Sequence, residues 1–480
     1  MTTWSELKNH FNACLPMADY ASLRFTTDDM EWLSVRNDVL EPPCSVTEKG
    51  FMVTVINGGG SGYAASSDLS ATGMKKAVQK ALEWAEISKK FPLVDWSKVK
   101  MPESQGGYAS AVERPWRDVP VEEKVGILKK ANELMKISDS IGDRVGWLQQ
   151  SRREAWHYTA GGNEFFQVFE HVFPYLEVHA NKNGEMLRRS NGGNIAPGQG
   201  GFESVARSGC PEIARTLAEE ALELLDAPNC PTGTMDILID PSQMALQVHE
   251  SIGHPIEVDR ILGDERNYAG TSFVKPEMFG TYQYGSNLLN IVFDPTANNE
   301  RASYAFDDEG RPGKREYLIR DGLLERGLGG TISEARCPIP GVANSRTSRW
   351  MRPPIDRIGN LNMEPGTSSL EEMIGSVEKG VMVKTNISWS IDDSRNKFQF
   401  GCEWGRLIEN GKLTTLVKKP GYRGISATFW RNLKMVGGKS TLARNGLNSC
   451  GKGEPNQCIW VGHTTPWALF KDVEVFGGDK

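Results

Sequence analysis

The sequence predicts an α+β protein in which an N-terminal mixed α/β domain is followed by a mainly antiparallel β domain. The chain has 480 residues, enough for two to four domains at roughly 100 to 200 residues each. Its first half alternates short apolar and β-branched runs with segments of helical periodicity. After about residue 280, glycine and proline separate many short strand-like runs, which is typical of a β-rich domain.

Composition and charge exclude several classes of protein. Apolar residues make up 39% of the chain and charged residues 24%, which excludes wholesale disorder and fibrous repeats. The net charge of −6 is mild, so we expect neither a nucleic-acid partner nor a membrane surface. The eight cysteines include no CxxC pair, the first eight residues do not resemble a signal peptide, and no run reaches about 18 apolar residues. A cytoplasmic protein with reduced thiols is therefore predicted.

The first elements are predicted to form a small antiparallel sheet. Three apolar runs bounded by polar or turn residues read as strands, at Leu23–Phe25, Trp32–Val35 and Phe51–Ile56. The glycine-rich segment 57–62 follows the third run. It lacks both the lysine of a phosphate-binding loop and the GxGxxG spacing, so we interpret it as the tip of a hairpin.

Helical spacing predicts three helices in the N-terminal half. The first follows a candidate cap at Thr72, the second follows Pro120 at the first helical turn, and the third begins at Pro211. Residues 145–180, between the second and third helices, are rich in aromatic and β-branched residues. We expect two or three further strands there.

A domain boundary is predicted at residues 227–233, where two prolines and a glycine separate well-patterned elements. The N-terminal domain would then span 1–226 and the C-terminal domain 234–480. The second domain opens with a strand at Met235–Ile239 and a helix whose cap is Asp240, followed by proline at the first helical position.

That helix ends in an HExxxH cluster, His249-Glu250-Ser251-Ile252-Gly253-His254. At about 100° per residue, positions i and i+5 of a regular α-helix differ by about 140°, so both imidazoles could not face one metal ion. Gly253 and Pro255 relax this constraint, because glycine permits unusual dihedrals and proline disfavours α geometry at the preceding residue. We therefore predict a π-type turn, or a break at Gly253, that brings His254 back toward His249. The alternative is a pair of helix-end histidines without a metal.

A catalytic zinc site needs a third protein ligand. Cys450 is a candidate because it lies in a glycine-rich turn with Lys452 nearby to favour the thiolate, although an ordinary reduced thiol remains the alternative. Cys458, eight positions further on, is a second candidate that spacing does not dismiss. The histidines outside the cluster are His10, His157, His171, His179 and His463.

Other motifs are interpreted more simply. The acidic segment 307–310 is expected to be a turn rather than a cation site. Four arginines around two prolines, Arg346, Arg349, Arg352 and Arg357, are expected in a solvated loop rather than as a carboxylate clamp. No GxSxG motif is present, which weakens a serine-hydrolase interpretation.

Several segments spread along the chain match the pattern of one known family: 249–255, 305–310, 318–324, 357–360, 364–366, 407–412 and 449–453. Taken together, they make the chain resemble the TldD/PmbA family of zinc peptidases, on the TldD side, over nearly its full length. The resemblance implies that His249, His254 and Cys450 hold Zn²⁺ and that Glu250 is the catalytic base. It further implies peptide substrates and a dimer, formed either with a second copy or with a PmbA/TldE-like sister chain that lacks the motif. The chain departs from the family pattern at 388–393, where a pair of glycines is common.

The predicted function is therefore a zinc-dependent metallopeptidase that hydrolyses short or unfolded peptides, with Glu250 as general base. Two alternatives remain. The chain could be a non-catalytic, peptide-holding subunit of a peptidase assembly, or a zinc amidohydrolase of small molecules.

Overall fold

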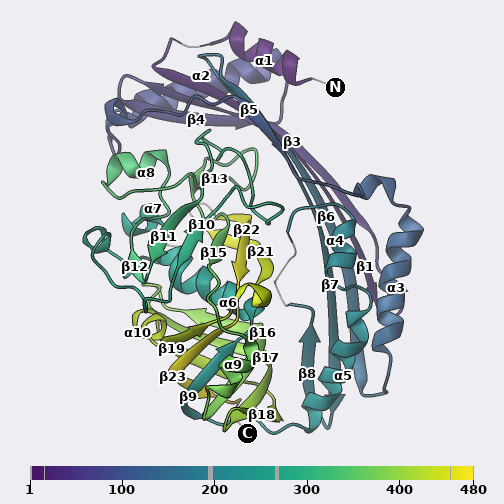
Figure 1. Ribbon diagram of the computed structural model, residues 1–480. Coiled ribbons are helices and arrows are strands. Elements are labelled where there is room, and N and C mark those ends of the chain that lie inside the picture. The colour runs from purple at the N-terminus through teal and green to yellow at the C-terminus, as the bar shows by residue number, and fades with distance from the viewer. Residues whose placement is uncertain (1–2, 16, 193–197, 265–269, 454–455, 479–480) are drawn as a thin grey trace.

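The computed structural model describes residues 3–15, 17–192, 198–264, 270–453 and 456–478. It confirms the predicted α+β class: one long-stranded sheet with helices in the N-terminal part, then smaller sheets in the C-terminal part (Figure 1). The predicted boundary at 227–233 begins directly after the last helix of the first part and ends at the first residue of the first strand of the second. The division into two domains at that point stays a prediction.

The N-terminal sheet has the strand order β4-β3-β1-β6-β7-β5, with β2 paired to β1 and β8 paired to β7. All of its pairings are antiparallel except that of β5 with β7. The strands are β1 (Tyr20–Arg36), β2 (Val39–Leu40), β3 (Cys44–Asn57), β4 (Gly60–Ser66), β5 (Gly106–Ala109), β6 (Ile141–Thr159), β7 (Glu164–Lys182) and β8 (Glu185–Ser190). The turn between β3 and β4 is the predicted glycine-rich hairpin tip.

β1 is longer than the apolar runs predict, because two of those runs belong to this one strand. β1 continues through the polar residues between Phe25 and Trp32, which pair with β3 on one side and β6 on the other. A cross-strand ion pair, Arg153 Nε to Asp28 Oδ1 at 2.6 Å, lies in this polar stretch. Backbone pairing on both sides therefore keeps polar residues in a strand that their own pattern does not indicate.

Helices cover one face of this sheet, and the other face is turned toward the C-terminal part (Figure 1). The helices are α1 (Trp4–Ala13), α2 (Ala71–Ser88), α3 (Val121–Met135), α4 (Glu203–Arg207) and α5 (Ile213–Asp226). The cap of α2 is Ser70, whose hydroxyl accepts from the Gly73 N–H, rather than the predicted Thr72. The third long helix begins two residues after Pro211.

The C-terminal part is built around a sheet that closes on itself. Its order is β16-β9-β23-β19-β17-β18, and β17 also pairs with β16, so five strands form a ring. Only the pairing of β9 with β16 is parallel among the strands of this ring. Its strands are β9 (Gly233–Ile239), β16 (Lys379–Ile391), β17 (Lys397–Glu409), β18 (Lys412–Val417), β19 (Gly421–Ile425), β20 (Leu433–Val436) and β23 (Ala468–Phe476).

Short strands are packed above this ring (Figure 1). A four-stranded sheet contains β10 (Ile291–Phe293), β11 (Glu316–Arg320), β12 (Leu323–Leu324) and β15 (Leu361–Met363). Two further ribbons are β13 (Ser345–Arg346) with β14 (Ile355–Asp356), and β21 (Ala443–Lys452) with β22 (Gln457–Thr465). The helices are α6 (Pro241–Val248), α7 (Val258–Ile261), α8 (Thr331–Arg336), α9 (Leu370–Gly375) and α10 (Ser426–Arg431).

The two parts share a core and a buried ion-pair network. One apolar cluster includes Leu224 of α5 together with Trp404 of β17 and Leu469 of β23. Beside it, the buried carboxylate of Glu403 accepts from Arg189 over 2.8 Å. These contacts fix the long sheet against the ring and so determine which face of the sheet lies over the loops of the C-terminal part.

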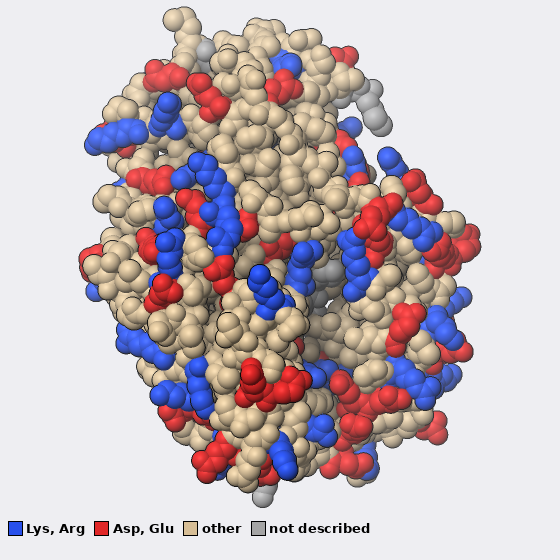
Figure 2. Space-filling model, viewed as in Figure 1, with Lys and Arg blue, Asp and Glu red and all other residues tan. Residues whose placement is uncertain are grey.

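Acidic and basic side chains are interspersed on the face of the molecule shown in Figure 2. This face therefore does not indicate a partner that carries charge of one sign. Among the described residues, no helix combines the length and the apolar character that crossing a bilayer requires.

Candidate metal centre

The helix that carries the HExxxH cluster changes its winding where the sequence predicts it. Asp240 caps α6 by accepting from the Gln243 N–H over 3.0 Å. The α-helix ends at Val248, and residues 249–253 form a π-helical turn followed by a 3₁₀ turn. The predicted π-type turn is thus confirmed. It brings the rings of His249 and His254 to a centroid separation of 4.6 Å.

Packing also explains the glycine in this turn. A Cβ atom on Gly253 would approach the Ile358 side chain to 2.6 Å, closer than real Cβ contacts. The π turn therefore packs directly against the side chains of Ile358 and Leu361, which would have to shift if residue 253 were larger.

Cys450 reaches the two histidines from the β21–β22 ribbon. The pairing register shifts between Leu447 and Cys450, and such a bulge re-aims a side chain. Sγ of Cys450 lies 3.6 Å from Nε2 of His254. One ligand atom each from His249, His254 and Cys450 lies within 4.8 Å of the other two, and all three residues are buried. In the described part of the chain, no other His, Cys, Asp or Glu group meets these criteria. Cys458 is exposed on β22 and lies outside this cluster.

His463 orients the ring of His249. Nδ1 of His463 lies 2.8 Å from the Leu361 carbonyl oxygen, which can only accept, so Nδ1 carries a proton. Burial holds the pKa of His463 well below its ordinary value, so the ring is neutral and its Nε2 accepts. That Nε2 lies 3.0 Å from Nδ1 of His249, which must therefore donate. The lone pair of His249 is consequently on Nε2, the nitrogen on the far side of the ring.

A buried carboxylate orients His254 in a comparable way. Glu257 accepts from Nδ1 of His254 over 2.9 Å, which leaves the lone pair of His254 on Nε2. Arg260 donates to the same carboxylate oxygen over 3.1 Å, and Lys452 Nζ lies 3.4 Å from the other oxygen. Burial would raise the pKa of Glu257, but Lys452, His254 and Arg260 hold it well below its ordinary value. Both imidazoles are thus held in the tautomer that presents Nε2 to a metal ion.

The thiol of Cys450 has its own cationic neighbour. Nη2 of Arg357 lies 3.2 Å from Cys450 Sγ and also donates to the Cys450 carbonyl over 2.5 Å. Burial raises the pKa of the thiol, but Arg357 and His254 outweigh it, and the pKa is lower than ordinary. The sequence assigns this role to Lys452, which is wrong, because Lys452 instead donates to Asp259 over 2.6 Å.

The predicted solvated arginine loop is also wrong for two of its four members. Arg357 is fully buried beside Cys450, and Arg346 is half-buried and donates to the carbonyls of Ile358 and Trp460, each over 2.8 Å. Both guanidinium groups also donate to backbone carbonyls of the β21–β22 ribbon, about 90 to 115 positions away, which local composition cannot indicate.

Glu250 lies beside the cluster at the wall of a cavity of about 740 Å³. Oε2 of Glu250 accepts from Arg395 Nη1 over 2.9 Å. Trp389, which is partly exposed, and Ser449 line the same cavity. Burial lowers the pKa of His249 to about 4 and also lowers that of His254, so neither ring carries a second proton near neutrality.

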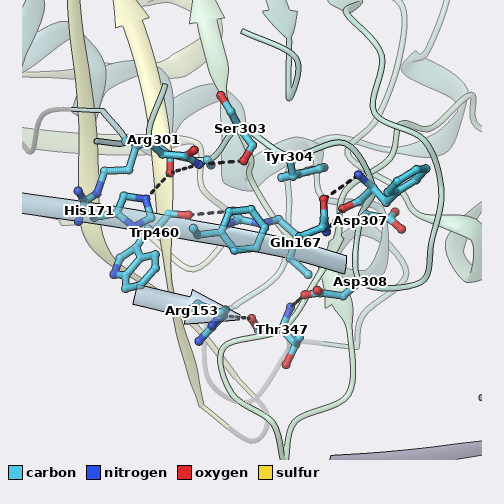
Figure 3. Close-up of a pocket in the computed structure, with 15 residues that line it drawn as sticks. Arg153, Gln167, His171, Arg301, Ser303, Tyr304, Asp307, Asp308, Thr347 and Trp460 are labelled. Atoms are coloured by element: carbon cyan, nitrogen blue, oxygen red, sulfur yellow. Dashed lines mark hydrogen bonds between the residues drawn. The ribbon is translucent and has the colours of Figure 1, made fainter. Parts of the chain in front are cut away.

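Polar side chains of the long sheet, among them Arg153, Gln167 and His171, meet those of the loops around the cluster; we call this contact the polar seam (Figure 3). Its residues surround a small cavity of about 40 Å³. His171 of β7 contacts the Arg301 carbonyl oxygen over 3.0 Å, and the Arg301 side chain donates to Asn448. Asn448 lies two residues before Cys450. The long sheet therefore supports the ribbon that carries the cysteine.

The acidic segment 307–310 forms the predicted turn, and it belongs to this seam as well. Gly310 donates to the Asp307 carbonyl over 2.9 Å, closing the turn. Asp308 accepts from the Thr347 N–H over 2.7 Å, while Arg153 of β6 donates to the Thr347 carbonyl over 3.3 Å (Figure 3). Its carboxylates thus hold loops in place.

Comparison with known proteins places the chain in a family. Residues 232–477 match the PmbA/TldA metallopeptidase C-terminal domain, and residues 21–85 match domain 1 of the same proteins. The chain belongs to the PmbA/TldD family of metallopeptidases. The first match covers the π turn and the Cys450 ribbon, so the cluster lies in the metallopeptidase domain.

Relatives within the PmbA/TldD family match over most of their lengths. A metalloprotease of Methanocaldococcus jannaschii is 26% identical over 425 residues, which cover 85% of this chain and 88% of the relative. A metalloprotease TldD homologue of Haemophilus influenzae is 24% identical over 462 residues, covering 96% and 93%. The names of these relatives support a metallopeptidase and imply a metal.

Solved structures share the PmbA/TldD fold. A Thermotoga maritima protein superposes with a TM-score of 0.78 at 18% identity, covering 99% of this chain and 100% of that one. TldE from Thermococcus kodakarensis gives 0.72 at 16% identity, covering 98% and 100%. At these identities the likeness shows the fold alone.

Sequence reasoning missed three residues of this centre: Glu257, Arg357 and His463. A local signal existed for Glu257, which follows His254 by three positions and so lies on the same side of a helical turn. No such local signal existed for the roles of the other two, because Arg357 lies 93 positions from Cys450 and His463 lies 214 positions from His249.

Proposed function

We propose that this chain is a zinc-dependent metallopeptidase that hydrolyses short or unfolded peptides, with Glu250 as general base. The observation that carries the proposal is the buried His249, His254 and Cys450 cluster beside Glu250 and a large cavity. Family membership supports the metallopeptidase class. The identity of the metal and the roles of the individual residues are inferred from the donor set and its geometry.

The three side chains fit a zinc ion. Zn–N bonds of about 2.0 Å and Zn–S bonds of about 2.3 Å put tetrahedrally arranged N and S atoms about 3.5 Å apart. The Cys450 Sγ to His254 Nε2 separation of 3.6 Å agrees with that value. Both imidazoles present an unprotonated Nε2, and Arg357 favours the thiolate of Cys450. Two nitrogens and one sulfur suit zinc, and a fourth position would remain open.

The protein side of the mechanism follows from Glu250. Zinc, when bound, would polarise the scissile carbonyl and lower the pKa of water from about 15.7 toward about 7. Arg395 holds Oε2 of Glu250 through a hydrogen bond of 2.9 Å, which leaves Oε1 to take a proton from the attacking water. The same oxygen then returns that proton to the leaving amine nitrogen.

Extended peptides suit this site better than folded proteins do. The β21–β22 ribbon is two-stranded in the described residues, so the outer edge of β21 offers backbone groups for main-chain pairing next to Cys450. Such pairing reads little side-chain identity, which is consistent with broad specificity. The family resemblance implies a dimer, formed either with a second copy or with a PmbA/TldE-like sister chain, and the proposal includes that dimer.

Two alternatives differ from this proposal in what they require. A non-catalytic, peptide-holding subunit has no use for a carboxylate held at a metal cluster. A zinc amidohydrolase of small molecules would use the same groups, and only its substrates would differ. Assays against a mixed peptide library and against small amides separate the latter from a peptidase.

The test compares the parent with Glu250→Gln. We expect both proteins to contain about one zinc per chain by elemental analysis. Peptide cleavage by the variant should fall by about two to four orders of magnitude, the usual contribution of a general base. Glu223→Gln, at an exposed position of α5, is the matched control and should cleave at the parental rate. Parental activity in Glu250→Gln, or a parent that holds no metal and cleaves no peptide, would refute the proposal. Native mass spectrometry at micromolar concentration tests the dimer.

A further inference from the structure

A second large cavity lies between the N-terminal sheet and the loops of the C-terminal part. Its volume is about 580 Å³, within the roughly 300 to 1,000 Å³ typical of small-molecule sites. It shares none of its lining residues with the cavity beside Glu250. A ligand here would therefore occupy a site separate from the metal centre.

The floor of this cavity is the polar face of the sheet. Tyr20, Ser22 and Arg24 alternate along β1 with residues that pack beneath α1 and α2, so their side chains lie on the opposite face. Arg24 pairs in register with Met52 of β3 on one side and with His157 of β6 on the other. One row across the sheet thus presents an apolar side chain, a guanidinium group and an imidazole to the same cavity.

Arg24 is a buried cation without a carboxylate partner in the described part of the chain. Only 6% of the residue is exposed, and its Nη2 donates to the Arg352 carbonyl over 2.5 Å. No described group accepts from its Nε. Asp308 favours the charge from beyond ion-pair distance, and Arg153 opposes it. A buried guanidinium group that meets only neutral acceptors is a strong site for an anion.

His157 adds a second uncommitted polar group. Its ring is buried and stacked on Phe165 at a centroid separation of 4.8 Å. In the described residues it makes no side-chain hydrogen bond that would account for its ring nitrogens. Burial and then Arg24 lower the pKa of His157 to about 3, so the ring is neutral and can either donate to or accept from a ligand.

The outer wall of the cavity is apolar and unusually exposed. Phe91 and Leu93, in the segment after α2, are 73% and 79% exposed, although both line the cavity. Trp96 and Met101 continue this wall. When a ligand covers large apolar side chains that face a cavity and are exposed to water, the free energy of the system falls, which favours binding.

We propose that this cavity binds a small organic carboxylate with an apolar body, its carboxylate at Arg24 and its body against Phe91 and Leu93. Arg24 selects the anion at its end of the cavity, and the wall selects the apolar body. Three carboxylates also line the cavity, but each has a partner: Asp264 accepts from Arg336, Asp308 from the Thr347 N–H and Glu309 from the Ser345 hydroxyl. A hydrophobic amino-acid or peptide C-terminus and an aliphatic acid share this chemistry. The proposal does not depend on the metal centre or on peptide hydrolysis.

The test measures binding by isothermal titration calorimetry with two pairs of probes. N-acetylphenylalanine and its amide represent the peptide source, and octanoate and octanamide represent the aliphatic source. We expect at least one carboxylate to bind about tenfold or more tightly than its own amide, the scale of a hydrogen bond to a buried charge. The pair with the greater ratio identifies the source. Equal affinity within both pairs, or no binding of either carboxylate at millimolar concentration, overturns the proposal.

Variants separate this site from the metal centre, which could itself attract carboxylates. Arg24→Gln should abolish the preference for carboxylate over amide. The double change of Phe91 and Leu93 to serine should weaken carboxylate and amide alike, and because both positions are exposed it should leave the fold intact. Met186→Ser, at an exposed apolar position of β8 outside the cavity, is the matched control and should bind as the parent does. A carboxylate preference that survives in Arg24→Gln, or unchanged binding in the double variant, overturns the assignment.

Discussion

If the contact between His463 and His249 orients the ring of His249, replacing His463 should weaken zinc binding. A role of His463 in stability alone would leave the zinc affinity unchanged. His463→Leu keeps the approximate volume but removes two hydrogen bonds, the 3.0 Å contact with Nδ1 of His249 and the 2.8 Å contact with the Leu361 carbonyl. His249 can then adopt the other tautomer or turn its ring. Both changes remove the Nε2 lone pair from the metal position.

The magnitude follows from these two contacts. A buried polar group left without its partner costs about 1 to 3 kcal/mol, and here one donor and one carbonyl lose theirs. Loss of an orienting partner of a metal-bound histidine usually lowers metal affinity about 10- to 100-fold, which corresponds to about 1.4 to 2.7 kcal/mol. We therefore expect His463→Leu to bind zinc about 10- to 100-fold more weakly. We also expect the metal-free protein to lose about 2 to 6 kcal/mol of unfolding free energy, because two buried groups lose their partners.

His463→Gln is the variant that isolates the mechanism. Its amide oxygen can accept from His249 while its NH₂ group donates to Leu361, so both hydrogen bonds are retained. We expect zinc affinity within a few-fold of the parent. His10→Leu, on α1 and outside the ligand cluster, controls for loss of a histidine as such.

Competition with a chromophoric zinc chelator measures the dissociation constants, and ¹⁵N chemical shifts of the imidazoles report the tautomer of His249 directly. The reasoning is refuted if His463→Leu binds zinc with parental affinity, or if glutamine weakens binding as much as leucine does.

Three further predictions rest on separate observations. Cys450→Ser should lose bound metal while Cys458→Ser, at an exposed position, should keep it; elemental analysis decides, and the reverse result would exchange their roles. Glu257→Gln removes the buried negative charge that pairs with Arg260 and Lys452. We therefore expect urea titration to show a loss of about 3 to 5 kcal/mol of unfolding free energy. Parental stability would mean that this ion-pair network is dispensable. Burial raises the pKa of Glu300 from 4.5 to about 7, so the native state holds a proton that the unfolded state releases. Its contribution to stability, about 3 kcal/mol, is complete below about pH 4.5 and is lost as the pH rises through 7. Glu300→Gln should flatten this part of the curve of unfolding free energy against pH. An unchanged curve would show that another group is responsible.

Local features of the metal centre could be read from the sequence because neighbouring residues determine them. The i, i+5 spacing of His249 and His254, with Gly253 and Pro255, predicts a π-type turn, and the structure contains one. The cap at Asp240 and the strand before it also follow from short-range pattern. Hydrogen bonding within a turn depends on residues a few positions apart, so the sequence carries this information directly.

The length of β1 shows where short-range pattern fails. Its polar middle has no strand signature of its own, and pairing with β3 and β6 holds it extended. For the same reason, the closure of the C-terminal sheet between β16 and β17 could not be predicted, although the strand-rich character of the region could. Composition predicts that strands exist, whereas register determines which of them meet.

The sequence by itself determined the α+β class, the altered winding of the HExxxH segment and two candidate cysteines. The family resemblance already implied Cys450 as the third ligand, and the structure places its Sγ at the two histidines. Only the tertiary structure replaced Lys452 by Arg357 as the cation at the thiol and set His463 beside His249. The tertiary structure also forms the cavity that Arg24 lines. The physical reason is range: His463 lies 214 positions from His249. Packing of the helical segment against the β21–β22 ribbon, rather than local propensity, brings the two side chains within 3.0 Å.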